Sequence, residues 1–297
     1  MGKNQSKIKE KQPAPAPAPC PLLDEPWRKV PWGNNKDNLQ YVMDYKPEYE
    51  NIKHLRVLLH GPVGAGKSSF INSVSNVIRR RYGIPAAASA NTSDTSFTRK
   101  YETHKFQITR KGQMTYYPVF FNDVMGMEEN SGISLEEIEL AMRGHVKEGY
   151  KFNPITPLSE GDHYFNQAPS EDDKVHVLVY VLSANMPTIT PSILHMMSRV
   201  RETASDLGIP QVAMITNIDT ACPETEKDLK NVYKSRHLQK KIKKFSSDVG
   251  IPMNCIYPVK NYSHEIDLND DVDTLILSAL RNMINFGDDF VKKKTNV

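Results

Sequence analysis

Eight residues, GPVGAGKS at positions 61–68, constrain the fold of this chain more than any other feature. They match the pattern G-x-x-x-x-G-K-[ST], in which glycines let backbone N–H groups turn inward around a chain of phosphates. The pattern has this meaning only between a strand and a helix. The run Leu55–His60 before it is short and apolar, and Lys67–Tyr82 after it carries apolar residues on one helical face. The sequence therefore predicts a phosphate-binding loop, with the positive end of the following helix directed at the anion.

Two side chains of this loop are predicted to act as ligands. Lys67 is expected to reach the β and γ phosphates, which also makes it a catalytic candidate, and the Ser68 hydroxyl is expected to bind Mg²⁺. The backbone of the loop supplies the remaining contacts. The predicted nucleotide-binding residues are Gly61, Pro62, Val63, Gly64, Ala65, Gly66, Lys67, Ser68 and Ser69. The alternative is a glycine-rich turn that binds nothing.

Strands and helices alternate along most of the chain and predict an α/β fold. Strands are expected at Leu55–His60, Lys105–Thr109, Thr115–Asn122, His176–Ser183, Gln211–Thr216 and Asn254–Pro258. Helices are expected at Lys67–Tyr82, Thr190–Asp206, Glu224–Ser246 and Asp271–Gly287. Such alternation produces parallel strands with helices on both faces, and the short link at 110–113 makes a hairpin with one antiparallel strand. We therefore predict a P-loop NTPase of the Ras-like type, with a six-stranded, mostly parallel sheet.

The remaining segments differ in composition. Residues 1–22 begin with four lysines against one glutamate and continue as a Pro–Ala alternation, which predicts a disordered basic tail. Residues 23–50 mix aromatic and charged side chains and are predicted to pack as a strap on the nucleotide domain. That domain is expected to span 51–290, with a helix and a long loop inserted at 127–174. Residues 291–297 form a second basic tail.

Charge and cysteine content exclude several classes of protein. The formal net charge of the 297 residues is only +3, which argues against nucleic-acid binding through bulk charge. Three widely separated cysteines form neither a disulfide framework nor a zinc-ligand cluster, so an intracellular protein is expected. No apolar run is long enough for a transmembrane helix.

A second acidic motif follows the phosphate loop. The apolar stretch Val119–Asp123 ends in a carboxylate that is expected near Mg²⁺, and the N–H of Gly126 is expected to contact the γ phosphate. Between the two motifs, the Ser- and Thr-rich segment at 88–98 predicts a mobile switch loop, in which one threonine closes over Mg²⁺. The candidates are Thr98 or Thr95, with Thr92 as a third. Ordinary polar turns have the same composition.

The segment after the fifth predicted strand is predicted to select the base of the bound nucleotide. Guanine-selective proteins carry N/T-K-x-D there, and the aspartate accepts hydrogen bonds from guanine N1–H and the exocyclic amine. Thr216 and Asp219 match this pattern, whereas Asn217 replaces the lysine whose stem normally covers the base. A later loop at 258–261, which contains Lys260, is placed to cover the base. A simple turn around Asn217 is the alternative.

Part of the usual hydrolytic machinery is missing. Ras-like enzymes place a glutamine directly after D-x-x-G to orient the attacking water, but this chain has Met127. The third loop residue is Val63, where a glycine would leave room for an arginine finger. Both departures predict slow hydrolysis. Glu128 or Glu129 is the remaining catalytic candidate, unless these residues only form a solvated turn.

Taken together, these motifs resemble the interferon-induced protein 44 family, including its 44-like members. The resemblance covers residues 26–290 and is carried by PWR at 26–28, HLRVLLHGPVGAGKSSFINSV at 54–74, NDVMGM at 122–127, TNID at 216–219 and VKNYSHE at 259–265. It implies a cytoplasmic protein that binds GTP or GDP with Mg²⁺ and is induced in the antiviral interferon response. Family members are often described with a TLDc domain ahead of the nucleotide domain, for which we expect no room here.

The expected function is guanine-nucleotide binding with slow or partner-dependent GTP hydrolysis. The alternatives are a GTPase with useful turnover, a nucleotide-bound scaffold without turnover and a P-loop kinase. A kinase needs an arginine-bearing lid, and Arg143 is the only arginine in the 127–174 insertion. The sequence leaves the protein partners open, a second copy of the chain included, and we expect no nucleic-acid partner.

The first residues, MGKNQS, fit the N-myristoylation pattern M-G-x-x-x-[ST], with Gly2 as the acceptor. Lys7, Lys9 and Lys11 follow closely. One acyl chain together with a basic patch can hold a protein at an anionic membrane. We therefore expect partial, peripheral membrane contact of an otherwise cytoplasmic protein. An exposed tail that only solubilises the chain is the alternative.

Overall fold

The computed structural model describes residues 22–49, 51–83, 100–110, 112–124, 126–127, 133–153 and 155–295. Several residues with predicted roles lie outside these ranges, and the roles assigned to them stay predictions. They are Gly2, Lys7, Lys9, Lys11, Thr92, Thr95, Thr98, Glu128 and Glu129. In the part of the chain that is described, no helix is both long and apolar enough to cross a membrane.

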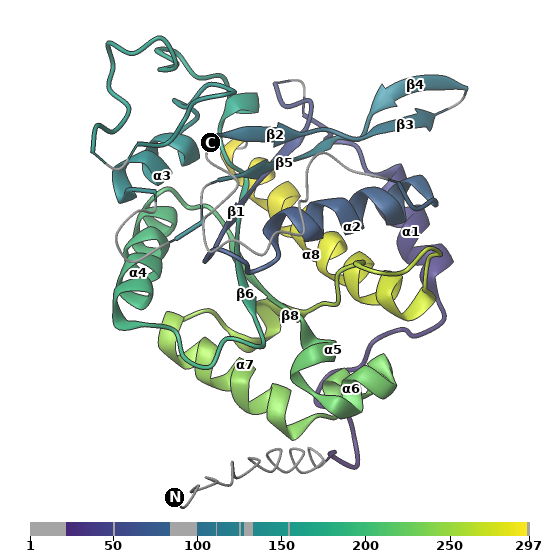
Figure 1. Cartoon of the computed structure of the whole chain (residues 1–297). Coiled ribbons are helices and arrows are strands. Elements are labelled where there is room, and N and C mark those ends of the chain that lie inside the picture. The colour runs from purple at the N-terminus through teal and green to yellow at the C-terminus, as the bar shows by residue number, and fades with distance from the viewer. Residues whose placement is uncertain are drawn as a thin grey trace, which may run out of the picture.

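A six-stranded sheet forms the centre of the molecule (Figure 1). Its strands, in the spatial order β2-β5-β1-β6-β7-β8, are β2 (Glu102–His104), β5 (Val119–Asp123), β1 (Leu55–His60), β6 (Val177–Ser183), β7 (Gln211–Thr216) and β8 (Ile256–Pro258). Five strands pair in parallel, and β2 pairs antiparallel with β5 at one edge. The predicted fold, an α/β P-loop NTPase with a mostly parallel six-stranded sheet, is confirmed.

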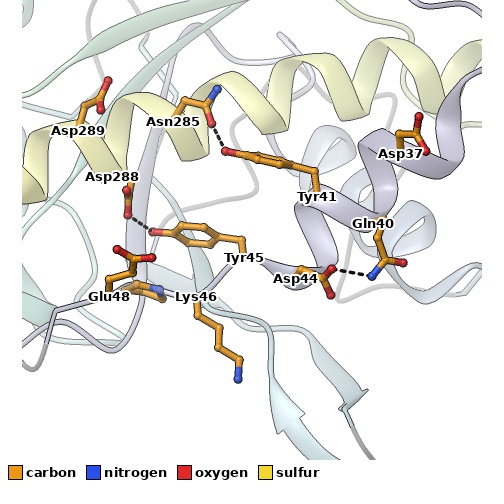
Figure 2. Close-up of a pocket in the computed structure, with 11 residues that line it drawn as sticks. Asp37, Gln40, Tyr41, Asp44, Tyr45, Lys46, Glu48, Asn285, Asp288 and Asp289 are labelled. Atoms are coloured by element: carbon orange, nitrogen blue, oxygen red, sulfur yellow. Dashed lines mark hydrogen bonds between the residues drawn. The ribbon is translucent and has the colours of Figure 1, made fainter.

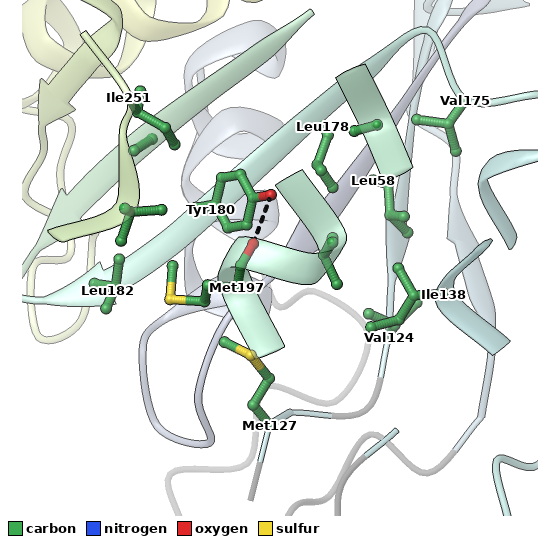
Figure 3. Close-up of a cluster of buried hydrophobic side chains, with 14 of the residues drawn as sticks. Leu58, Val124, Met127, Ile138, Val175, Leu178, Tyr180, Leu182, Met197 and Ile251 are labelled. Atoms are coloured by element: carbon green, nitrogen blue, oxygen red, sulfur yellow. Dashed lines mark hydrogen bonds between the residues drawn. The ribbon is translucent and has the colours of Figure 1, made fainter. Parts of the chain in front are cut away.

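Helices cover both faces of this sheet. They are α1 (Asn35–Asp44), α2 (Lys67–Arg79), α3 (Leu135–Met142), α4 (Pro191–Asp206), α5 (Ile218–Ala221), α6 (Pro223–Lys227), α7 (Arg236–Val249) and α8 (Asp270–Thr295), with short 3₁₀ turns η1 (Glu171–Asp173), η2 (Leu229–Tyr233) and η3 (Met253–Cys255). Alternate side chains of β1 point to opposite faces. Val57 and Leu59 pack with α2 and α8, whereas Leu58 packs with α3 and α4 in a second apolar cluster (Figure 3).

The predicted hairpin at 105–122 divides into two separate parts, which corrects the strand assignment. Its outer half, β3 (Gln107–Arg110) and β4 (Gln113–Tyr116), forms a two-stranded sheet of its own that projects beyond α2 in Figure 1. The inner half joins the main sheet as β5, paired with β2, a three-residue strand too short to detect from composition. Pro118 lies at the division and has no N–H to donate, so it interrupts the ladder. The side chains of β4 are exposed, whereas those of β5 are buried.

The predicted helix Glu224–Ser246 is also wrong as a single element. α6 ends at Lys227, the 3₁₀ turn η2 follows, and α7 begins only at Arg236. The break is specified locally, because the Ser235 hydroxyl accepts a hydrogen bond from the N–H of Leu238 and so caps α7.

The last helix extends beyond its predicted end at Gly287 and reaches Thr295. Glycine usually weakens a helix interior, and this one was expected to end it. The structure gives Gly287 a packing reason instead. A Cβ at this position would lie 2.9 Å from a methyl group of Leu55 and 3.0 Å from one of Val177. The missing side chain therefore lets α8 approach the sheet closely.

The segment before β1 lies against the C-terminal half of the chain. Trp27 and Arg28 contact Tyr233, and the Arg28 guanidinium donates to the carbonyls of Met253 (2.5 Å) and Ile256 (2.8 Å). Further along, α1 packs on α8, where Tyr41 donates to Asn285 and Tyr45 to Asp288 (Figure 2). A hollow of about 1110 Å³ lies beside this helix pair. Its charged lining is mostly acidic: Asp37, Asp44, Glu48, Asp288 and Asp289 against Lys46.

Candidate functional site

The loop at 61–66 joins β1 to α2 and has the geometry of an anion cradle. Gly64 and Gly66 have φ angles of +72° and +92°, a conformation that glycine adopts without the cost other residues incur. Gly66 is the N-cap of α2 and supplies no capping side chain. The first N–H groups of the helix therefore face the loop without a side-chain partner, where the helix dipole favours negative charge.

Two further glycines allow the backbone to pack closely around this loop. A Cβ on Gly61 would lie only 2.0 Å from the carbonyl oxygen of Val181 in β6. A Cβ on Gly126 would lie 2.6 Å from a methyl group of Val63 and 2.8 Å from the Val63 nitrogen. The structure thus brings the D-x-x-G glycine against the phosphate loop, and the N–H of Met127 donates to the Gly61 carbonyl at 3.1 Å.

Replacing Gly61 by alanine should destabilise the protein far more than replacing Gly64. At Gly61 the new methyl group meets rigid backbone, so we expect a loss at the upper end of the range for overpacking, about 3 kcal/mol. At Gly64 a Cβ has no neighbour within 4 Å, and only the left-handed backbone is strained, by about 1–2 kcal/mol. Thermal unfolding of the two variants tests this. Equal losses would contradict the close packing at Gly61.

Lys67 is buried in the phosphate loop. Its side chain folds back so that Nζ donates to the carbonyl oxygens of Gly61 (3.0 Å) and Pro62 (3.1 Å). The residue is only 7% exposed, and burial lowers the pKa of its ammonium group, an effect that the charge of Asp123 opposes. A buried cation whose direct contacts are neutral carbonyls fits an anionic ligand, because phosphate oxygens would stabilise its charged form.

Two of the predicted metal ligands meet next to this lysine, and the third, Thr98 or Thr95, lies outside the described residues. Ser68, at the start of α2, donates from Oγ to Oδ2 of Asp123, at the end of β5, over 2.5 Å. Asp123 is 1% exposed. In the described ranges no group of three or more His, Cys, Asp or Glu side chains could hold a metal. Mg²⁺ does not need such a cage, since it is usually held by one or two carboxylates together with substrate phosphates. The donor set therefore fits Mg²⁺ bound with a nucleotide.

The segment predicted to select the base contacts the phosphate loop through Thr216. The Thr216 hydroxyl contacts the carbonyls of Ala65 (2.7 Å) and Leu182 (3.1 Å), which ties the end of β7 to the phosphate loop. Asn217 has a left-handed φ of +55°, and its side-chain amide donates to Ser183 (3.1 Å). Thr216 thus connects β7 to the phosphate loop and to β6, and Asn217 connects the ends of β7 and β6.

Lys260, from the loop after β8, lies beside the aspartate of TNID. Its Nζ lies 3.8 Å from Oδ2 of Asp219 and 2.8 Å from Oε1 of Glu265. Burial alone would raise the pKa of Glu265, but hydrogen bonds from Lys260 and from backbone N–H groups lower it to about 2. Glu265 therefore stays ionised and holds Lys260 next to Asp219.

Sequence reasoning assigned no role to Glu265 or Ser183, and it placed Asn261 only as part of the loop at 258–261 expected to cover the base. Asn261 donates from Nδ2 to the Gly66 carbonyl at 3.2 Å, so the loop after β8 contacts the phosphate loop directly. Glu265 and Asn261 belong to VKNYSHE, which carried the family resemblance, and this was the available signal. Ser183 belongs to no motif, and only its position at the end of β6 could have indicated it.

Met127 has its side chain in the apolar interior. It is 4% exposed and belongs to the cluster in Figure 3. With Ile193 and Met196 of α4 it also lines an apolar hollow of about 340 Å³. The residue that follows D-x-x-G therefore contributes a packed thioether, with no group that could orient a water molecule.

Comparison with known proteins identifies relatives of this chain, although no family model matches it. Interferon-induced protein 44 from Pan troglodytes and from Homo sapiens is 30% identical over 259 residues, which is 86% of this chain and 57% of each relative. Interferon-induced protein 44-like from Homo sapiens is 30% identical over 254 residues, 84% of this chain and 55% of the relative. The chain thus spans just over half the length of these curated relatives.

Solved structures of Toc33 from Arabidopsis thaliana are also similar. One is a dimerization-deficient mutant and the other a complex with GDP and Mg²⁺. Both are 13% identical, cover 86% of this chain and 93% of their own, and have TM-scores of 0.48 and 0.47. The sequence relatives are more informative. The chain is a homologue of interferon-induced protein 44 and its 44-like relative over most of its length, which confirms the resemblance predicted from its motifs.

Proposed function

We propose that this protein binds GTP and GDP together with Mg²⁺ at the loop between β1 and α2. The buried ammonium group of Lys67 carries the proposal. It lies in a glycine loop at a helix N-terminus, where, among the described residues, it donates to two backbone carbonyls. In the bound state Lys67 and the loop N–H groups hold the phosphates. Ser68 and Asp123 then contact the metal, joined by Thr98 or Thr95 from the switch segment.

Guanine is the proposed base, and Asp219 is the residue that selects it. A carboxylate accepts from both guanine N1–H and the exocyclic amine, whereas adenine presents neither group in that arrangement. Lys260 lies beside Asp219, so its aliphatic stem is placed to cover the base face. This arrangement supports guanine selection despite the replacement of lysine by Asn217.

The nucleotide retained through purification tests the proposal directly. After denaturation we expect GDP or GTP in the supernatant, identified by chromatography. Calorimetric titration of the emptied protein should show binding of GTP and no binding of ATP. Titrating with and without Mg²⁺ measures the part played by the metal. Equal affinity for ATP and GTP would reject guanine selection, and no binding of either would reject the function.

Hydrolysis is proposed to be slow. The side chain of Met127 is packed in the apolar cluster, so the water-orienting group of Ras-like enzymes is missing at this position. We expect single-turnover rates several orders of magnitude below about 10 per second, an ordinary enzyme rate. Fast hydrolysis by the isolated protein would contradict this and implicate another group, such as Glu128. The same observation favours a nucleotide-bound scaffold as the second candidate function.

The biological setting is proposed from the relatives' names. We infer that the protein is induced by interferon and acts in antiviral defence within the cytoplasm, with part of it held at membranes through an acylated Gly2. Metabolic labelling with a myristate analogue, compared between the unmodified protein and Gly2→Ala, tests the membrane proposal. Labelling that persists in the variant, or is missing from both, contradicts it.

A further inference from the structure

The loop that follows β8 is fixed to the phosphate loop by a side chain with no other assigned role. Asn261 is 9% exposed and donates from Nδ2 to the Gly66 carbonyl at 3.2 Å. Its Oδ1 is also buried and has no hydrogen-bond partner among the described residues. The fit is close, since a Cβ on Gly66 would lie 3.0 Å from Nδ2 of Asn261. Burial of a polar amide is unfavourable unless it forms a hydrogen bond, and here the bond to the Gly66 carbonyl offsets that cost.

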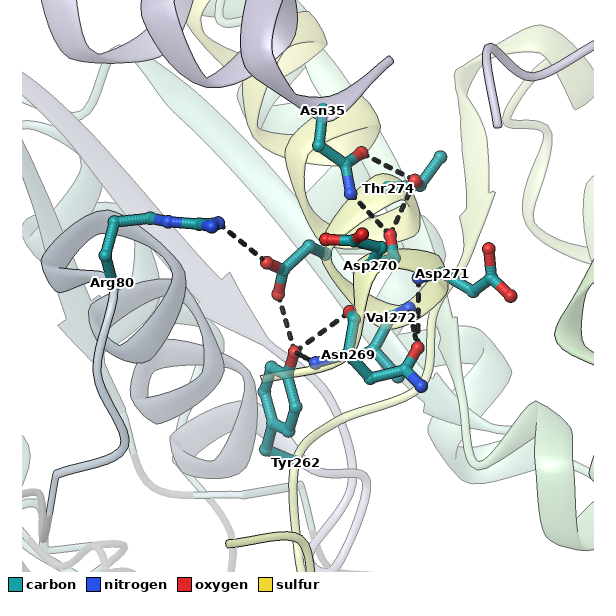
Figure 4. A network of polar contacts seen from close by, with 9 residues as sticks. Asn35, Arg80, Tyr262, Asn269, Asp270, Asp271, Val272 and Thr274 are labelled. Atoms are coloured by element: carbon teal, nitrogen blue, oxygen red, sulfur yellow. Dashed lines mark hydrogen bonds and ion pairs between the residues drawn. The ribbon is translucent and has the colours of Figure 1, made fainter. Parts of the chain in front are cut away.

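Tyr262, the next residue, fixes the same loop at two further points, and Figure 4 shows the contacts made by its hydroxyl. Its N–H donates to Oγ of Ser73 on α2 at 2.9 Å, and its hydroxyl contacts Oδ1 of Asp273 on α8 at 2.6 Å. Asp273 is fully buried and also pairs with Arg80, just beyond the end of α2, at 3.2 Å. Both ends of α2 and the start of α8 are thus connected through the loop that carries Lys260.

We propose that Asn261 and Tyr262 are positioning residues that hold Lys260 over the base and so slow the release of bound guanine nucleotide. The inference rests on the proposed function. A nucleotide bridges the phosphate loop and the base loop, so it leaves most readily when the two loops separate. The bonds from Asn261 to Gly66 and from Tyr262 to Ser73 are the ones that this separation breaks.

Release of a fluorescent GDP, mant-GDP, into excess GDP tests the inference in stopped flow. Asn261→Ala removes the bond to the Gly66 carbonyl. Tyr262→Phe removes the hydroxyl that bonds Asp273 and the backbone of Asn269 and keeps the N–H that bonds Ser73. Each variant should release mant-GDP about fivefold to tenfold faster. Matched controls are Asn282→Ala, whose amide donates to Ser278 within α8, and Tyr41→Phe, whose hydroxyl donates to Asn285. Both controls should release mant-GDP at the unmodified rate.

A second probe separates positioning from general damage to the site. Pyrophosphate has no base, so its affinity should be unchanged in Asn261→Ala and Tyr262→Phe. Ser73→Ala, which takes away the acceptor for the Tyr262 N–H, should speed mant-GDP release even if Asn261→Ala does not fold. Weaker pyrophosphate binding in step with faster release would indicate a distorted phosphate loop and overturn the inference.

The remaining outcomes are distinct. If the unmodified protein retains mant-GDP and the variants release it at the same rate, the positioning role is rejected and guanine-nucleotide binding stands. If the unmodified protein does not retain mant-GDP, the proposed function fails, and the role in release fails with it.

Discussion

Replacement of Lys67 by alanine is expected to abolish measurable GTP and GDP binding and to leave the domain folded. Lys67 supplies the buried positive charge of the phosphate loop, and each hydrogen bond to a charged group contributes about 1.5–3 kcal/mol. Losing two such contacts to phosphate lowers affinity by at least about 100-fold. Calorimetric titration with GTP and Mg²⁺ measures the loss.

The fold should survive because the two carbonyls that Lys67 contacts keep other partners. The Gly61 carbonyl also accepts from the N–H of Met127, and the Pro62 carbonyl accepts from the N–H of Ala65. The substitution also removes a charge whose burial is unfavourable, as the lowered pKa of Lys67 indicates. Lys243→Ala, an exposed site on α7, is the control and should bind GTP normally. Unchanged GTP affinity in a folded Lys67→Ala protein would disprove the phosphate-loop assignment.

Replacement of Asp219 by asparagine is expected to change which base the protein prefers. A carboxylate accepts two hydrogen bonds from guanine, whereas an amide accepts with its oxygen and donates with its nitrogen. Xanthine carries a second carbonyl in place of the exocyclic amine and can accept that donated bond. With two charged hydrogen bonds at stake, the preference for GTP over XTP should fall by about 100-fold or more.

Competition of GTP and XTP against mant-GDP measures this change. Asp248→Asn on α7 is the matched control, because Asp248 pairs with Lys244 away from the site. Lys260→Ala offers a second comparison: it should weaken GTP and XTP alike, because its stem would cover either base. An Asp219→Asn protein that still prefers GTP as strongly as the unmodified one would place base selection elsewhere.

The phosphate loop and the fold class were accessible from the sequence because their requirements are local. A strand, a glycine turn and an amphipathic helix follow one another within 55–82, and each is recognised by its own pattern. Alternation of strands and helices then implies a parallel sheet, since parallel neighbours need a crossover between them. The ends of parallel strands gather at one edge, so Ser68, Asp123 and Thr216 could be expected near each other before their contacts were known.

Local patterns failed where tertiary packing overrides them. Gly287 was expected to end a helix, but it lies inside α8. A glycine is needed there because Leu55 and Val177 leave no room for a side chain. The helical pattern of 224–246 was expected to be continuous, yet the chain turns at η2, where Tyr233 packs against Trp27 and Arg28. At Gly287 the partners are distant in sequence, so no window of neighbouring residues contains the cause. At η2 the packing of Tyr233 on Trp27 and Arg28 adds to a local signal, the Ser235 cap of α7.

The arrangement around the base depends on tertiary structure most of all. The pattern TNID showed that a lysine was missing and the loop at 258–261 was expected nearby, but the contact of Lys260 with Asp219 is visible only in the folded chain. The bond from Asn261 to Gly66 joins residues 195 positions apart. Periodicity and motif spacing depend on residues that are close in sequence, whereas such contacts depend on the positions of β1, β7 and β8 in the sheet. The phosphate-loop pattern is therefore a property of one short segment, whereas the proposed base site depends on the whole fold.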